Sequence, residues 1–171
     1  MAGLRMEISG KDEALAALGE ALARMDRPGP LFDEIGRMLT VSTQKRFEAG
    51  IDPEGNSWPK SLRARLTGGK TLVDTSNLMG SITHEASDEG VAVGTNVIYA
   101  GPHQTGATIV AKTAKGLRFE IEGAWVTRQS VTLPRRAFLG LDEDDESDIV
   151  ALTGDFLVAP LGGADAESVD G

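Results

Sequence analysis

The spacing of apolar residues changes from helical to alternating near residue 82, and this change limits the chain to folds that mix helices with antiparallel strands. Up to residue 50 the apolar positions lie three or four apart, which predicts helices over 11–25 and about 31–49, the second ended by Gly50. The positions that set this spacing are Leu15, Leu18, Leu22, Met25, Phe32, Ile35, Leu39 and Phe47. A short alternating run at 4–8 predicts one strand before the helices.

Alternating apolar and polar residues predict strands in the middle of the chain. Residues 82–86 and 91–93 flank the turn "SDEG", which predicts a hairpin with Gly90 at the position that needs a positive φ. A longer excursion follows, in which residues 117–121 alternate and Pro134 ends the last strand. Before these strands, 51–70 is predicted to be a loop, and 72–82 a short helical or turn segment capped by Thr75 or Ser76.

Helical spacing returns near the end of the chain, where Ile149, Leu152 and Phe156 predict a last helix. The predicted fold class is therefore α+β, an antiparallel β-sheet with a long hairpin excursion, packed against two N-terminal helices and one C-terminal helix. We expect a single domain over 1–158 and an acidic, flexible C-terminal tail over 159–171.

Composition excludes several kinds of site. The 171 residues include no cysteine, so disulfides, thiolate metal sites and cysteine nucleophiles are excluded. The chain has no apolar run of about 18 residues, and its first residues lack the apolar stretch of a signal peptide. We therefore expect a soluble protein that is made in a cytoplasm and has no membrane partner.

Charge is segregated along the chain. The formal net charge is −9, and the stretch from residue 137 onward holds ten acidic residues and no Lys or Arg. Between 107 and 136 there are six bases against two acids, and these bases are Lys112, Lys115, Arg118, Arg128, Arg135 and Arg136. This pattern indicates either contacts with different partners at two places or two solvated loops of opposite sign.

The stretch "VGTNVIYAGPHQTGA" at 93–107 is the strongest candidate for an active site, because it brings Tyr99, His103 and Gln104 within six positions. A small hydrolase could use His103 with His84 or an Asp for acid–base work. The sequence contains no HExxH, no GxSxG and no Gly-rich phosphate loop with its Lys-Ser/Thr. A lone histidine on an alternating strand, such as His84, is more often a packed residue than a ligand.

Two charged segments raise the question of ligands. The run "DEDDESD" at 142–148 lacks the spacing and glycine of a calcium loop, which favours a solvated helix start over a cation site. The basic segment 112–136 has only Phe119 and Trp125 as aromatic residues, which disfavours sequence-specific nucleic-acid binding and leaves loose phosphate contact open. No cofactor is predicted.

Five motifs in a fixed order resemble a known family. They are "RF" at 46–47, "DPEGNSWPKSL" at 52–62, "LVDTSNLMGSI" at 72–82, "VAVGTNVIYAGPHQTGA" at 91–107 and "LPRRAFLGL" at 133–141. Together they are similar to the virion morphogenesis or tail completion proteins of Mu-like phages and prophages, over roughly 31–152. Thr75-Ser76 stands where the family usually has Thr-Gly, and Ala137 where it usually has Pro.

The resemblance implies a structural virion protein rather than an enzyme. Such a protein is made in the bacterial host's cytoplasm and resides at the neck or tail of the virion. It is expected to form a ring, a hexamer, around the DNA channel and to take part in head–tail joining. Its implied neighbours are head–tail connector or adaptor proteins, the tail terminator, and tail tube or sheath proteins, with DNA passing through without sequence-specific binding.

The resemblance gives the motif residues structural roles. We expect Gly94 and Gly101 to allow backbone turns, Tyr99 to bury its ring with a paired hydroxyl, and His103 and Gln104 to bond backbone groups. Trp58 should pin its loop to the core, as should Phe138 and Leu139. The predicted structural set is Trp58, Gly94, Tyr99, His103, Gln104, Gly106, Phe138, Leu139 and Gly140, and the six bases of 112–136 are the predicted partner interface.

Overall fold

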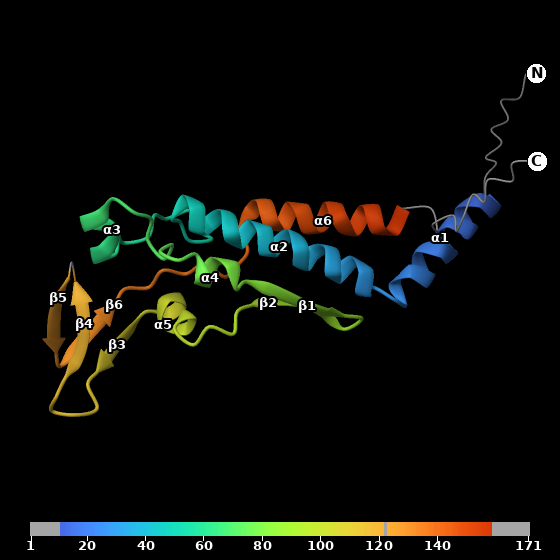
Figure 1. The fold of residues 1–171 in the computed structure, drawn as a ribbon. Helices are drawn as coiled ribbons and strands as arrows, with labels where there is room; N and C mark the ends of the chain where they lie inside the picture. Colours follow the sequence, from blue (N-terminus) through green and yellow to red (C-terminus); the bar gives the residue numbers. More distant parts are fainter. Residues whose placement is uncertain (1–10, 122, 159–171) are drawn as a thin grey trace, which may run out of the picture.

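The computed structural model describes residues 11–121 and 123–158 (Figure 1). The strand predicted at 4–8 and the acidic tail predicted at 159–171 lie outside the described residues. The described elements are helices and small antiparallel sheets, so the predicted α+β class is confirmed.

Helix α2 (Gly29–Ala49) is the centre of the fold. It begins two residues before the predicted start, because Pro30 suits the first helical turn, where no backbone N–H is needed. It ends as predicted at Gly50, whose left-handed backbone lets its N–H donate to the Arg46 carbonyl at 2.7 Å. One side of α2 packs against a β-hairpin and another against the last helix, α6 (Glu143–Val158).

Helix α1 (Lys11–Met25) has the predicted bounds but not the predicted packing. Its four large apolar side chains are between 51% and 62% exposed, and they are Leu15, Leu18, Leu22 and Met25. The helix contacts α6 near its C-terminal end, where the Arg24 guanidinium donates to the Leu157 carbonyl at 2.6 Å. Figure 1 shows α1 projecting from one end of the helical body.

The predicted hairpin forms β1 (Thr83–Ser87) and β2 (Gly90–Gly94), paired antiparallel with His84 opposite Val93. Gly90 lies in the turn with φ of 156°. The hairpin lies against α2, and the His84 ring is so close to Gly36 that a Cβ there would stand 2.4 Å from the ring carbon Cδ2.

The predicted excursion is a hairpin within a hairpin. Strands β3 (Ala107–Val110) and β6 (Ser130–Leu133) pair antiparallel, and β4 (Leu117–Ile121) pairs with β5 (Ala124–Arg128) beyond them. We call residues 107–133 the arm. Figure 1 shows the arm at the end of the molecule opposite α1. The described strands thus form three two-stranded sheets instead of one continuous sheet.

The described chain has three short helices, and the sequence predicted only the one that lies within 72–82. Helix α3 (Leu62–Thr67) lies in the predicted loop, and the Ser61 hydroxyl caps it by accepting from the Ala64 N–H at 3.1 Å. Helix α4 (Asn77–Gly80) follows Ser76, which takes a left-handed conformation and makes no capping bond. Helix α5 (Ala100–Thr105) separates β2 from β3, which is one reason why the strands do not join into one sheet.

The core lies where α2, the loop before α3, and the segment before α6 meet. It consists of Phe47, Trp58, Leu78, Ile82, Ala100 and Phe138. The Phe47 ring is fully buried and contacts Phe138 at 5.0 Å and Trp58 edge-on at 5.4 Å between centroids. These contacts fix the base from which the arm extends.

Candidate functional site: a basic cleft between the arm and the helices

Gln104, on α5, fastens the 137–140 segment to the base of the arm. Its side-chain oxygen accepts from the N–H groups of Phe138 and Leu139 at 3.0 and 3.1 Å, and its amide nitrogen donates to the Leu139 carbonyl at 2.7 Å. The buried Trp58 adds an indole N–H bond to the Ala137 carbonyl at 2.9 Å. Both side chains thus do what their motifs suggested, and Phe138 is seated in the core between them.

Glycine is required at two places in the motifs. Gly106 has φ of 77°, and a Cβ there would stand 3.0 Å from the Arg135 backbone nitrogen. The chain therefore enters the arm in close contact with the backbone that leaves it. Gly140 lies against Pro53, whose Cγ would be 2.6 Å from an added Cβ. Gly94 and Gly101 differ from expectation, because neither has a positive φ nor any neighbour within 4 Å of a Cβ.

Arg46 makes a buried ion-pair cluster with the start of α6. Its guanidinium donates to the carbonyls of Phe138 and Gly140 and to the carboxylates of Asp142, at 2.8 Å, and Asp145. The two aspartates also cap α6 reciprocally, each accepting the other's backbone N–H. The acidic run at 142–148 is therefore not simply solvated, since Asp145 is buried.

The positive charge of Arg46 affects the pKa of Asp142. Burial alone would raise the pKa of Asp142, but hydrogen bonds from Arg46 and from the backbone of Asp145, together with the positive charge, bring the pKa below its ordinary value. The spacing D-x-x-D before an apolar run was the sequence signal for this cap, and the buried partner at Arg46 gave no local signal.

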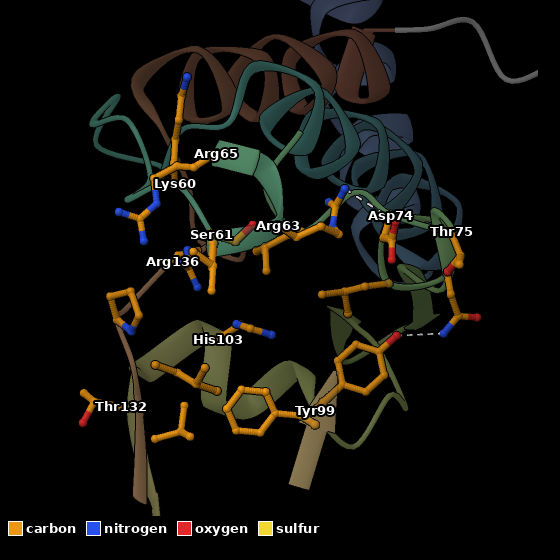
Figure 2. Close-up of a pocket in the computed structure, with 18 of the residues that line it drawn as sticks. Lys60, Ser61, Arg63, Arg65, Asp74, Thr75, Tyr99, His103, Thr132 and Arg136 are labelled. Carbon is orange, nitrogen blue, oxygen red and sulfur yellow. Dashed lines mark hydrogen bonds and ion pairs between the residues drawn. The ribbon is translucent and has the colours of Figure 1, made fainter. Parts of the chain in front are cut away.

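A cleft of about 840 Å³ lies between the arm and the segment 60–78. We call it the basic cleft, because among the described residues that line it there are five Lys or Arg side chains and one carboxylate. The bases are Lys60, Arg63, Arg65, Arg128 and Arg136. Figure 2 shows Lys60 and Arg65 along one side of the cleft and Tyr99 and Thr132 along the other.

The cleft is also lined by apolar side chains. Leu62, Leu72, Phe119 and Val126 contribute to it, with Phe119 and Val126 coming from the arm. Asp74, the one acid, is paired with Arg63 at 3.5 Å. A lining that combines positive charge with apolar side chains suits an acidic, amphipathic partner.

Two residues of the 93–107 motif face the cleft. Tyr99 is 48% exposed rather than buried, and its hydroxyl accepts from the Asn77 amide at 2.9 Å (Figure 2). The His103 ring lies edge-on to Tyr99, 6.5 Å between centroids. Burial, reinforced by the positive charge of Arg136, lowers the pKa of His103 below its ordinary value.

The geometry does not bring His103 and His84 together, which was one form of the alternative hydrolase site. The His103 Nδ1 atom is buried, and no hydrogen-bond partner for it is found in the described chain. His84 lies elsewhere, on the hairpin, where its Nε2 is 3.0 Å from Asp33 and its Nδ1 is 3.5 Å from the Thr40 hydroxyl. The two histidines line different cavities.

The six predicted interface bases fall into different surroundings. Arg136 is only 5% exposed, and its Nε donates to the Pro59 carbonyl at 2.7 Å, so it is a structural residue of the cleft wall and not a surface contact. Arg118 stacks over the exposed Trp125 ring at 4.4 Å, and Arg135 stands 3.9 Å from Glu54. Lys112, Lys115 and Arg128 are exposed on the arm.

Sequence reasoning missed half of the cleft. Lys60, Arg63 and Arg65 lie in the stretch that was predicted to be a loop, and the spacing of bases in "KSLRAR" around Leu62 was the available signal. In 11–121 and 123–158 no group of three or more acidic or histidine side chains is arranged to hold a metal ion. No helix in those ranges is long and apolar enough to cross a membrane.

Comparison with known proteins assigns the chain to a family. The model of the phage virion morphogenesis family matches residues 11–157, which include every element from α1 to nearly the end of α6. Mu-like prophage FluMu G protein 2 of Haemophilus influenzae is 33% identical over 147 residues, covering 86% of this chain and 91% of the relative. No solved structure matches the chain. The protein therefore belongs to the phage virion morphogenesis family, whose role is a structural one in building the virion.

Proposed function

We propose that this protein completes the neck or tail of a tailed phage or a phage-derived particle. It forms a ring, a hexamer, between the head–tail connector and the tail, and it is needed for joining heads to tails. The family supports a role in virion morphogenesis, and a structural role accounts for the motifs without catalysis.

One observation carries the proposal. The two ends of an elongated body, α1 and the arm, expose large apolar side chains, among them Leu22, Val110 and Trp125 at about 60%. Apolar surface of this extent on a single chain marks contacts with other proteins. A subunit of an assembly would use the exposed apolar side chains at both ends as contacts, whereas catalysis would not require them at either end.

The charged surfaces of the protein indicate what kind of neighbour each would contact. The exposed bases Lys112 and Lys115 on the arm suit an acidic face of a connector, adaptor, tail terminator, tube or sheath protein. The acidic surface at the start of α6 suits either a basic neighbour or a lumen through which DNA slides by repulsion. The protein would thus be made in the bacterial cytoplasm and end in the virion.

Deleting the gene from an inducible phage or prophage tests this role. We expect DNA-filled heads and separate tails in electron micrographs, with infectivity restored when the gene is supplied in trans. Infectious particles of normal yield from the deletion would contradict the proposal.

Non-specific binding of nucleic acid is the second candidate, because the basic cleft carries Tyr99 and Phe119 beside its bases. It predicts binding of the purified protein to duplex or single-stranded DNA that falls steeply with salt concentration. If the purified protein does not bind DNA at low salt, this second candidate function is wrong.

A further inference from the structure

The exposed side of α1 has the form of one half of a helix contact. Leu15, Leu18, Leu22 and Met25 follow one another at intervals of three, four and three, which places them in one row along the helix. We call this row the α1 seam. Among the described residues of α1 only Ala21 and Arg24 are half-buried, so the helix is fastened to the body near one end and its seam is uncovered.

The charges beside the α1 seam are mostly acidic. Asp12, Glu13, Glu20 and Asp26 are exposed on or directly after the helix. Glu20 is 3.7 Å from Arg24, whose guanidinium is already engaged with the Leu157 carbonyl. A receptor for this helix should therefore combine an apolar surface with free positive charge.

The basic cleft has that combination. Its lining includes the apolar side chains of Leu62, Leu72 and Phe119, and its exposed bases Lys60, Arg65 and Arg128 have no ion pair within the described part of the chain. Both halves of a helix-in-groove contact are thus present on one chain.

We propose that α1 of one copy lies in the basic cleft of the next copy. Figure 1 shows α1 and the arm at opposite ends of the body, so one chain does not fill its own cleft with its own α1. Each copy offers a helix at one end and a cleft at the other. The contact is therefore head-to-tail, and such contacts repeat from copy to copy and close into a ring when the rotation allows.

This inference rests on the proposed ring and names the contact that builds it. It differs from a symmetric pairing of two α1 helices, because a symmetric contact occupies the same surface on both copies and therefore stops at a dimer. It also differs from a cover of the α1 seam by residues of the same chain, which would leave the protein monomeric.

Two variants separate these arrangements, each altering exposed residues so that the monomer should fold. The helix variant carries Leu18→Lys and Leu22→Lys, and the cleft variant carries Leu62→Asp and Arg65→Glu. Their masses are measured by light scattering after gel filtration, alone and mixed in equal amounts, beside the wild-type protein. Val150→Lys on the exposed side of α6 controls for the lysines, and Lys112→Glu with Lys115→Glu controls for the charge reversal.

We expect the wild type and both controls to form a ring, and each variant alone to be a monomer of 18.0 kDa. The mixture should give a dimer of one copy of each, about twice that mass, because only one intact helix and one intact cleft remain. Circular dichroism equal to that of the wild type shows that the variants are folded.

Other outcomes overturn the inference. A cleft variant that assembles like the wild type would mean that α1 binds another surface, and two variants that both assemble would place the ring contact elsewhere. A wild-type protein that stays monomeric alone would mean that the seam is covered within its own chain. A cleft variant that assembles but loses DNA binding would make the cleft a nucleic-acid site. None of these results decides whether the gene is needed for head–tail joining, which the deletion tests separately.

Discussion

At the scale of single residues, the base of the arm depends on one backbone conformation and one amide side chain. Gly106 has a positive φ of 77° and lies against Arg135, while Gly101 has an ordinary conformation and open space around it. The two glycines are five positions apart in the same motif, so they provide a matched comparison.

Gly106→Ala should destabilise the fold by about 1–3 kcal/mol, because alanine is strained at this φ and its Cβ would crowd the backbone. Gly101→Ala should be neutral or stabilise by up to about 1 kcal/mol, since alanine restricts the unfolded chain more than glycine does. Urea unfolding followed by tryptophan fluorescence measures both. Equal losses for the two variants would contradict this account.

Gln104→Ala should cost about 2–4 kcal/mol of unfolding free energy, because it leaves two backbone N–H groups and one carbonyl without their partner. Gln129→Ala is the matched control, since the exposed Gln129 makes one long bond of 3.3 Å, and it should change stability by less than about 0.5 kcal/mol. A loss no larger at Gln104 than at Gln129 would show that these bonds are replaced by water.

His103 should make the fold less stable in mild acid. Its pKa is lowered in the folded state, so below its ordinary value of 6.5 the unfolded chain binds the proton more readily and gains population. We expect the melting temperature of the wild type to fall more between pH 7 and pH 5 than that of His103→Gln. Parallel curves for the two proteins would remove His103 as a source of the pH dependence.

The sequence could predict residues whose partner is the backbone nearby or the common core, such as Gln104 and Trp58. It could not predict that Tyr99 would be exposed or Arg136 buried, because both depend on where the arm folds back relative to α3. Burial of a charged side chain is rare enough that composition favours the opposite expectation.

At the scale of elements, α6 is held against α2 by the buried cluster around Arg46. Asp145→Ala should cost about 3–5 kcal/mol, because removing one partner of a buried ion pair leaves the other charge poorly compensated. Asp144→Ala, one position earlier on the exposed side of the helix, should cost less than about 1 kcal/mol. Chemical unfolding of the two variants checks the difference, and similar small effects would show that α6 docks by apolar contacts alone.

Periodicity predicted the long elements well and the short ones poorly. The bounds of α1 and α2 follow from three or more turns of regular spacing. Helices α3 and α5 have six residues each, which is too short for a repeating pattern. Alternation predicted the hairpin of β1 with β2 and the strand at 117–121, but it did not show how the strands of the arm pair, so the division into three small sheets could not be foreseen.

At the scale of the whole molecule, the outer half of the arm contributes little to the body. Strands β4 and β5 pair only with each other among the described strands. The hairpin of β3 and β6 has its last backbone hydrogen bond from the Ala111 N–H to the Gln129 carbonyl, at 2.8 Å. Replacing 112–128 by Asn-Gly, which suits a two-residue hairpin turn, should leave the melting temperature within a few degrees of the wild type. The same protein should fail to support head–tail joining in a complementation assay. Full complementation would show that the outer arm is dispensable in the virion.

The Arg46 cluster also sets an order of events during synthesis. Its two carboxylates lie 96 and 99 positions later in the chain, so they leave the ribosome long after α2 has been made. Until then the Arg46 charge has no partner to be buried with, and the core around Phe47 lacks Phe138. A chain stopped before this point should thus remain open and be recognised by proteases as unfinished. Only completed subunits would then be available for incorporation into a particle, where a defective copy could not be replaced.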